Sequence, residues 1–329
     1  MDGAGLVFVT RTLPAGSLEP LLDAGYRVLG PGAADPRDPA GVDPSPGPDE
    51  LRKAVAGADG LVCLLTDRID RSVIEAGAGR LRVIANVAVG HDNIDLGAAR
   101  RAGIVVCNTP GVLDETTADL AFALILAASR LMSEAEADLR AGRWTGWDVT
   151  EYLGHDVHGA ILGVVGWGRI GQAVARRAAG FGMQVLHHTR RPTGEPGCIA
   201  DLDHLLGVAD VVTLHVPLTA ATRHLVDARR LALMKSTAVL VNTARGPVVD
   251  EEALADALQA GRLFAAGLDV YEHEPAVHPR LLDAPRTVLL PHIASASVAT
   301  RTAMGRLAAR SVVEVLAGRR PPTVVTAGG

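Results

Sequence analysis

The chain has 329 residues, of which 48% are apolar and 21% are charged, and its mean hydropathy is +0.22. These values are typical of globular proteins and exclude an intrinsically disordered chain. The length predicts two domains. The formal net charge of −5 excludes an overall basic field that would attract nucleic acid.

The cysteines and the N-terminal residues indicate a cytoplasmic protein. Residues 1–14 lack a basic segment followed by a long apolar core, so we expect no signal peptide. The longest apolar run, residues 120–129, is about half of the ~20 residues that a membrane span needs, so we interpret it as a buried helix. Cys63, Cys107 and Cys198 lie far apart in sequence, and we expect reduced structural thiols and no metal site.

Strand-like and helix-like segments alternate along the first 108 residues. Because strands that alternate with helices form βαβ units, this region predicts a parallel sheet. A proline-rich stretch, residues 31–48, interrupts the pattern and is expected to be a surface loop or local insertion. The expected strands are residues 6–10, 26–30, 60–65, 81–87 and 105–108, and the expected helices are residues 17–25, 50–58, 71–79 and 93–103.

A second α/β series follows a long helical stretch. Residues 114–141 predict one helix, whose length suits a crossing or dimer-forming element. Residues 143–159 form an expected loop rich in aromatic residues, and a last helix is expected over residues 296–317. The expected strands of the second series are residues 161–166, 184–189, 211–216, 238–243, 265–270 and 287–292.

The first turn of the second series has the pattern G-x-G-x-x-G, formed by Gly166, Gly168 and Gly171. It lies between an apolar strand and a helix. There the first glycine permits a tight turn, the second allows close approach of a pyrophosphate, and the third lets helix and strand pack closely. The pattern therefore predicts dinucleotide binding, with a purely structural turn as the alternative.

The end of the next strand bears on which dinucleotide is bound. An NAD site needs an acid there, ~20 residues after the glycines, to bind the ribose 2′-hydroxyl. Here the strand ends in Thr189, Arg190 and Arg191, and the nearest downstream acid is Glu195, beyond Pro192. Because guanidinium groups pair well with a 2′-phosphate, we predict that NADP(H) is preferred and that NAD(H) remains possible. The alternative is that both arginines are solvated surface charges.

Polar residues follow three later strands, where the carboxyl edge of a parallel sheet forms its crevice. They are Arg245, Asp269 with Glu274, and His292. Reduction of a carbonyl by a nicotinamide needs a proton donor, a cation for the substrate carboxylate, and a group that tunes the donor. His292, Arg245 and Glu274 would supply these, because a carboxylate beside an imidazole favours its protonated form.

Together these stretches resemble the D-isomer-specific 2-hydroxyacid dehydrogenase family, and within it the glyoxylate/hydroxypyruvate reductase branch. The resemblance runs over most of the chain in order, and several motifs in order are more specific than the glycine turn alone. The motifs are NVAVGHDNID from residue 86, NTPGVLDETTADLAFALILAASR from 108, GVVGWGRIGQAVARR from 163, HVPLT from 215, LMKSTAVLVNTARGPVVDEEAL from 233, GLDVYEHEP from 267 and PHIASAS from 291.

The resemblance implies catalytic roles for the three polar residues. His292 resembles the acid/base that protonates the substrate carbonyl, Glu274 its partner, and Arg245 the arginine that binds the carboxylate. The loop with Val89 and Gly90 resembles one whose backbone N–H groups hold that carboxylate. Trp147 resembles an aromatic residue that reaches the substrate of the neighbouring subunit in a homodimer, with ordinary dimer packing as the alternative.

The resemblance also implies the cofactor contacts and the layout of the chain. We expect two doubly wound parallel-sheet domains: a flavodoxin-like substrate domain, residues 1–108 and 292–329, and an inserted Rossmann cofactor domain, residues 109–291. Within the glycine turn, Trp167, Arg169 and Ile170 are expected beside the cofactor. The other implied contacts are Thr117, Thr189, Arg190, Arg191, Val216, Pro217, Thr243, Ala244 and Asp269.

The expected activity is hydride transfer between NADPH and a short 2-oxo acid, with glyoxylate and hydroxypyruvate as the best candidates. One alternative is another D-2-hydroxyacid dehydrogenase, such as D-3-phosphoglycerate dehydrogenase. Another is a non-catalytic dinucleotide-sensing protein like the corepressors built on this fold. The chain departs from the branch at Val87 and His91, where aromatic residues are frequent, and at Ala294, where glycine is common.

Overall fold

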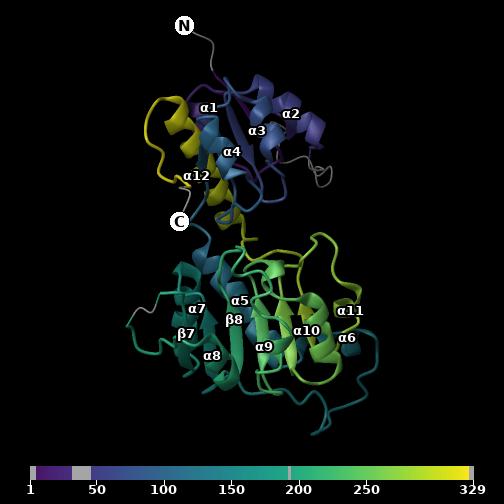
Figure 1. The fold of residues 1–329 in the computed structure, drawn as a ribbon. Helices are drawn as coiled ribbons and strands as arrows, with labels where there is room; N and C mark the ends of the chain where they lie inside the picture. Colours follow the sequence, from purple (N-terminus) through teal and green to yellow (C-terminus); the bar gives the residue numbers. More distant parts are fainter. Residues whose placement is uncertain (1–4, 32–45, 192–193, 326–329) are drawn as a thin grey trace. The chain divides into compact units, whose positions relative to one another are not determined.

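The computed structural model describes residues 5–31, 46–191 and 194–325 (Figure 1). It divides into two compact units: Met1–Leu113 with Ser295–Gly329, called the split unit, and Asp114–Ala294, called the central unit. Most of the proline-rich stretch, residues 32–45, lies outside the described residues. The sequence predicts boundaries at 108/109 and 291/292. The second boundary lies between Ala294 and Ser295 instead, because Asp269 binds the backbone of Ile293 and Ala294 and so keeps His292 in the central unit.

The split unit has a parallel five-stranded sheet of order β2-β1-β3-β4-β5, as in flavodoxin-like folds. Successive residues of a strand point to opposite faces of the sheet, and helices cover both of these faces. Gly60 faces Val312 of the last helix, and Leu61 packs in the core under the other helices. The elements are β1 (Leu6–Val9), α1 (Glu19–Asp23), β2 (Arg27–Leu29), α2 (Pro48–Gly57), β3 (Gly60–Cys63), α3 (Arg71–Ala76), β4 (Val83–Asn86), α4 (Leu96–Arg101), β5 (Val105–Cys107) and α12 (Val298–Leu316).

The central unit has a parallel six-stranded sheet of order β11-β10-β9-β8-β6-β7. A single parallel bridge from His187 to Cys198 continues the sheet beyond β7, so the order read from that edge is that of a Rossmann fold. The elements are α5 (Asp114–Ser129), α6 (Met132–Arg140), β6 (Ile161–Val165), α7 (Arg169–Ala179), β7 (Gln184–His188), α8 (Leu202–Val208), β8 (Val211–Leu214), α9 (Ala228–Leu231), β9 (Val239–Asn242), the 3-10 helix η2 (Gly246–Val248), α10 (Glu251–Gln259), β10 (Ala265–Leu268), α11 (Pro279–Leu282) and β11 (Thr287–Leu289).

Both faces of the central sheet are also buried. Val211 packs with α5 and α7 on one face, and the next residue, Val212, packs with α8 and α10 on the other. The inner strands β6, β8, β9 and β10 are accordingly apolar apart from Thr213 and Asn242, as expected for a parallel sheet that is covered on both sides. The predicted fold, two doubly wound parallel-sheet domains, is therefore confirmed.

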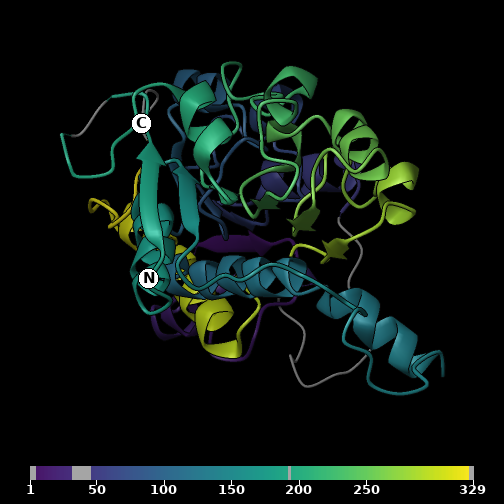
Figure 2. The same cartoon turned by 90° about the horizontal axis from the view of Figure 1, so that it is seen from below.

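The prediction of one helix over residues 114–141 is wrong. The chain forms α5 and α6, which are bent by 68° at the break between them (Figure 2). Leu131 adopts a left-handed φ of +54°. The carbonyl of Ser129 accepts a hydrogen bond from His155 N at 2.8 Å, and Gly154 packs against the same oxygen. This oxygen at the end of α5 is therefore bonded to a segment that lies about 25 residues later in the chain.

The buried-helix interpretation of residues 120–129 agrees with the structure. Ala121, Leu124 and Ile125 of α5 are almost completely buried. Within the part of the chain that the structure describes, no single helix has the length and apolarity to cross a membrane. Among the helices that the structure describes, the bent pair of α5 and α6, taken together, reaches that length and composition.

Candidate active site

The three glycines of the turn between β6 and α7 have distinct surroundings. Gly166 has a φ of +105°, and a Cβ there would lie 2.4 Å from the carbonyl oxygen of His215. A Cβ on Gly171 would lie 2.1 Å from the oxygen of Gly166. Gly168 caps the N-terminus of α7, and apart from its two chain neighbours no described atom lies within 4 Å of its Cβ position. Side chains at the first and third positions would therefore clash, whereas the second glycine leaves open space over the helix N-terminus.

Two residues between these glycines, Trp167 and Arg169, are held in place by contacts with other side chains of the protein. The Trp167 ring stacks on the His187 ring at 3.8 Å, and Arg169 forms an ion pair with Asp114 at 3.0 Å. Ile170 is partly buried in the first turn of α7. The remaining predicted residues, Thr189, Arg190 and Arg191, follow directly after β7, and both arginines are exposed.

Further predicted cofactor residues follow β8 and β9 at the same carboxyl edge of the sheet. Pro217, just after Val216, accepts a hydrogen bond through its carbonyl from Thr222 Oγ1 at 2.6 Å, and Ala244 N donates to Asn242 Oδ1 at 3.0 Å. Thr243 is buried, and its hydroxyl has no hydrogen-bond partner among the described residues. A buried hydroxyl without a partner is costly, and a polar ligand would satisfy it. With the open space at Gly168, this fits a dinucleotide.

The side chains of His292 and Glu274 are hydrogen-bonded in the central unit. His292 Nδ1 lies 2.8 Å from Glu274 Oε2, and Tyr271 N donates to Glu274 Oε1 at 3.0 Å. Burial opposes ionisation of Glu274, but the hydrogen bond and charge of His292, the Tyr271 N–H and the charge of Arg245 outweigh it and hold the pKa of Glu274 below its usual value. His292 has a left-handed φ of +55°, a conformation that is uncommon for residues other than glycine.

Asp269 anchors the segment that follows His292. It is completely buried, and its two oxygens accept hydrogen bonds from Ile293 N at 2.7 Å and Ala294 N at 2.8 Å. Burial raises the pKa of Asp269 although these N–H groups oppose the rise. The sequence did not suggest this role. Contact of Asp269 with a cofactor, which the resemblance implies, stays a prediction.

Arg245 is fixed next to the Glu274 loop by a close contact between two backbones. Gly246 lies so close to Tyr271 that a Cβ would be 1.8 Å from the Tyr271 carbonyl carbon. Asn242 Nδ2 donates to the Arg245 oxygen at 2.9 Å, and Arg245 Nη1 donates to the Ala244 oxygen at 2.8 Å. The central unit thus brings together the carboxyl ends of the strands that carry Arg245, Asp269, Glu274 and His292.

A partly buried carboxylate network next to the Glu274 loop was not predicted. Glu272 N donates to Glu251 Oε1 at 2.6 Å, and Glu251 N donates to Glu272 Oε1 at 3.1 Å. His224 Nε2 lies 3.0 Å from Glu272 Oε2. The network braces the loop that carries Glu274. Only the density of acids in residues 250–252 and 272–274 hints at it in the sequence, and acids are usually solvated.

The other predicted substrate residues occupy different parts of the chain. Val89 and Gly90 lie in the split unit, where their carbonyls accept hydrogen bonds at 2.8 Å from Asn108 Nδ2 and Asn86 Nδ2. Trp147, in the loop after α6, is 83% exposed. Thr117 is buried on α5. Among the described residues, no group of three or more His, Cys, Asp or Glu side chains suits a metal ion.

Comparison with known proteins identifies the family. Residues 122–294 match the model of the D-isomer specific 2-hydroxyacid dehydrogenase, NAD binding domain. The chain is 44% identical over 329 aligned positions to the glyoxylate reductase of Thermococcus kodakarensis, covering 97% of this chain and 95% of that one.

Solved structures agree over nearly the whole chain. The TT0316 protein of Thermus thermophilus superimposes with a TM-score of 0.89 at 46% identity, covering 98% of this chain and 100% of that one. An NADPH-dependent glyoxylate/hydroxypyruvate reductase of Sinorhizobium meliloti, in complex with NADP and malonate, has a TM-score of 0.83 at 34% identity, covering 98% and 97%. The predicted family and enzyme class are confirmed: the chain belongs to the D-isomer specific 2-hydroxyacid dehydrogenase family and is an NAD(P)-dependent oxidoreductase.

Proposed function

We propose that the enzyme reduces short 2-oxo acids, with glyoxylate and hydroxypyruvate as preferred substrates, and that it prefers NADPH to NADH. The observation that carries this proposal is the His292–Glu274 pair, which the Gly246–Tyr271 contact holds beside the loop of Arg245. Relatives named glyoxylate reductase and glyoxylate/hydroxypyruvate reductase support the substrate class. The exposed Arg190 and Arg191 support the cofactor preference.

The glycine turn and the edge residues after β8 and β9 would hold the cofactor. Gly168 leaves room for a pyrophosphate at the N-terminus of α7, and the Thr243 hydroxyl has a hydrogen bond to give. When bound, a reduced nicotinamide supplies the hydride that adds to the carbonyl carbon. The protein has to bind the carboxylate, orient the carbonyl and deliver a proton.

The proton comes from His292 in this proposal. Its Nδ1 is engaged with Glu274, which leaves Nε2 to protonate the carbonyl oxygen as the hydride arrives. Arg245 binds the substrate carboxylate in this proposal, the role that the resemblance implies for it. Holding the acid in this way orients its carbonyl before reaction, which lowers the entropic part of the barrier.

The Glu274 carboxylate is expected to stay ionised wherever the enzyme is active. The hydrogen bond and charge of His292, the Tyr271 N–H and the charge of Arg245 hold its pKa below the usual value, so Glu274 should keep its charge as the pH falls to about 5. Glu274→Gln keeps an oxygen that can accept a hydrogen bond and removes the charge. We expect kcat/KM for reduction at about pH 7 to fall by at least about tenfold in this variant. Steady-state kinetics of both proteins test this, and an unchanged kcat/KM contradicts the pairing.

A panel of 2-oxo acids assayed with each cofactor tests the proposed function. We expect kcat/KM to be highest for glyoxylate and hydroxypyruvate with NADPH. A higher value for a phosphorylated or branched acid would indicate another dehydrogenase of the family. NADPH that binds without being oxidised by any acid would indicate a dinucleotide-sensing protein.

We also propose a homodimer formed through α6 and the loop after it. Large exposed apolar patches mark interaction sites, and this region exposes the apolar side chains Met132, Leu139, Trp144, Trp147, Val149 and Leu153. Trp147 would reach the substrate of the partner subunit. Sedimentation at micromolar concentration should give a dimer, and Trp144→Ser with Leu153→Ser should give monomers. A wild-type monomer would refute this interface.

A further inference from the structure

In the structure the carboxylate of Glu195 lies beside the glycine turn, where the sequence did not predict an acid. Glu195 lies beyond Pro192, and its place in the sequence suggested that β7 ends without a nearby carboxylate. In the structure Trp167 Nε1, between the first two glycines of the turn, donates a hydrogen bond to Glu195 Oε2 at 2.6 Å. The Glu195 carboxylate therefore lies against the glycine turn.

Two contacts with β7 hold this arrangement. The Trp167 ring stacks on His187 with an angle of 14° between the ring planes, and His187 is completely buried. His187 N also donates to the Gly197 oxygen, and Ile199 N donates to the His187 oxygen, both at 2.8 Å. The same β7 residue thus positions both the indole and the segment that follows Glu195.

The region between the glycine turn and the end of β7 is where this fold places the adenosine end of a dinucleotide. In doubly wound sheets the ribose lies at the end of the second strand, ~20 residues after the glycines. Here that position is the end of β7, which Thr189, Arg190 and Arg191 follow. A carboxylate accepts hydrogen bonds from a ribose 2′-hydroxyl but repels a 2′-phosphate, whereas guanidinium groups attract the phosphate.

We propose that Glu195, held by Trp167, is a specificity-determining residue of the cofactor site that weakens NADPH and supports NADH. Its negative charge counteracts the positive charges of Arg190 and Arg191. The ratio of NADPH affinity to NADH affinity is therefore smaller than the arginines alone would give. This inference rests on the cofactor preference proposed above. It adds Glu195, whose charge is opposite to that of the two arginines, and Trp167, which positions Glu195.

Calorimetric titration of the full-length protein with NADPH and with NADH, without any 2-oxo acid, tests the inference. Glu195→Gln keeps an oxygen that can accept from the indole N–H and removes the charge. We expect NADPH to bind about three- to tenfold more tightly to this variant and NADH to bind equally or more weakly. The gain for NADPH should shrink as salt is raised, because the repulsion is screened.

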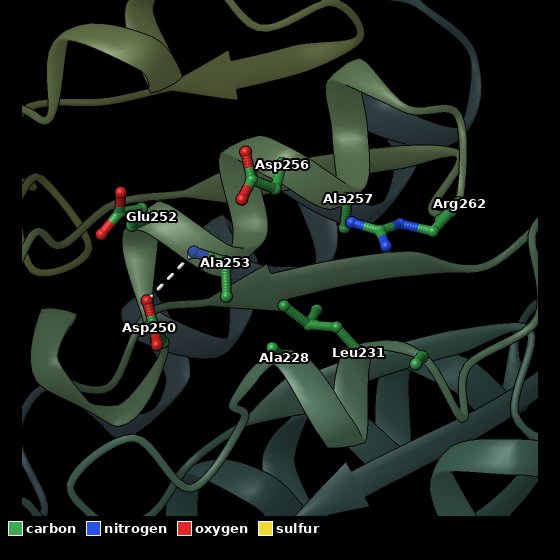
Figure 3. Close-up of a pocket in the computed structure, with 9 residues that line it drawn as sticks. Ala228, Leu231, Asp250, Glu252, Ala253, Asp256, Ala257 and Arg262 are labelled. Carbon is green, nitrogen blue, oxygen red and sulfur yellow. Dashed lines mark hydrogen bonds between the residues drawn. The ribbon is translucent and has the colours of Figure 1, made fainter.

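A matched variant controls for the loss of one negative charge. Glu252 is exposed at the start of α10, beside a surface cavity of about 250 Å³ between α9 and α10 (Figure 3). It precedes β10, which three strands separate from β7. Glu252→Gln should leave the NADPH/NADH affinity ratio unchanged. If it shifts the ratio as much as Glu195→Gln does, the effect is one of net charge and the inference is wrong.

Trp167→Phe tests the placement. It keeps a ring to stack on His187 and removes the N–H donor, so Glu195→Gln should change the ratio less in this background. An equal change in both backgrounds would overturn the role of Trp167, and an equal change for both nucleotides would overturn that of Glu195.

Arg190→Ala separates the two proposals. It should weaken NADPH much more than NADH. If it does so while Glu195→Gln has no effect, the NADPH preference stands and Glu195 does not contribute. If the wild-type protein binds neither nucleotide, both proposals fall.

Discussion

Replacing His292 by alanine should lower kcat for reduction of the preferred 2-oxo acid by about 10²–10⁴-fold while the Kd for NADPH stays within about twofold. The side chain that would deliver the proton is lost, whereas the glycine turn and Thr243 are untouched. Steady-state kinetics and calorimetry measure the two quantities separately. Turnover that survives in the variant would remove His292 from its role.

Backbone strain at this position needs its own control. His292 has a left-handed φ, which alanine adopts at some cost and asparagine tolerates better. His292→Asn should therefore fold as well as the wild type and still lose turnover, because an amide does not act as an acid at neutral pH. If it were as active as the wild type, the proton would have to come from another group.

Gly246→Ala should disrupt the site without changing any of the groups assigned to chemistry. The added Cβ would lie 1.8 Å from the Tyr271 carbonyl carbon, so one of the two loops has to move. These loops hold Arg245 and Glu274. We expect the free energy of unfolding to fall by about 1–3 kcal/mol and kcat/KM to fall about a hundredfold, because small displacements of positioned groups are costly. Thermal unfolding and steady-state kinetics check both effects.

A second glycine in the same unit provides the matched control. Gly207 lies inside α8, and a Cβ there would have its nearest heavy atom, the Leu233 oxygen, at 3.6 Å, which is an ordinary contact. Gly207→Ala should leave turnover unchanged and stabilise the helix by about 0.5–1 kcal/mol. If Gly246→Ala were equally harmless, the close contact would not position the site.

Much of the site was predictable because its signals are local. The glycine spacing specifies a turn whose close contacts, at Gly166 and Gly171, are made mainly within that turn and with the neighbouring strand end. Polar residues that directly follow apolar strands predict a shared edge, because the carboxyl ends of parallel strands lie together. This reasoning placed Arg245, Glu274 and His292 correctly at strand ends of one sheet.

The supporting contacts were not predictable because they join residues that are distant in sequence. The sequence gives no sign that the oxygens of Asp269 bind backbone groups 24 and 25 residues away. Glu251 and Glu272 read as solvated acids but exchange hydrogen bonds across 21 residues.

The order of the amino acids was enough to establish the class of fold and to predict a nucleotide-binding turn and the groups that we propose for carbonyl reduction. Periodicity, glycine spacing and residue chemistry act over a few residues and can be recognised there. Where the helix after residue 114 ends, and which acid lies against the glycine turn, became clear only from the folded chain. Both depend on segments that return from elsewhere in the sequence, as His155 does to Ser129 and Glu195 does to Trp167.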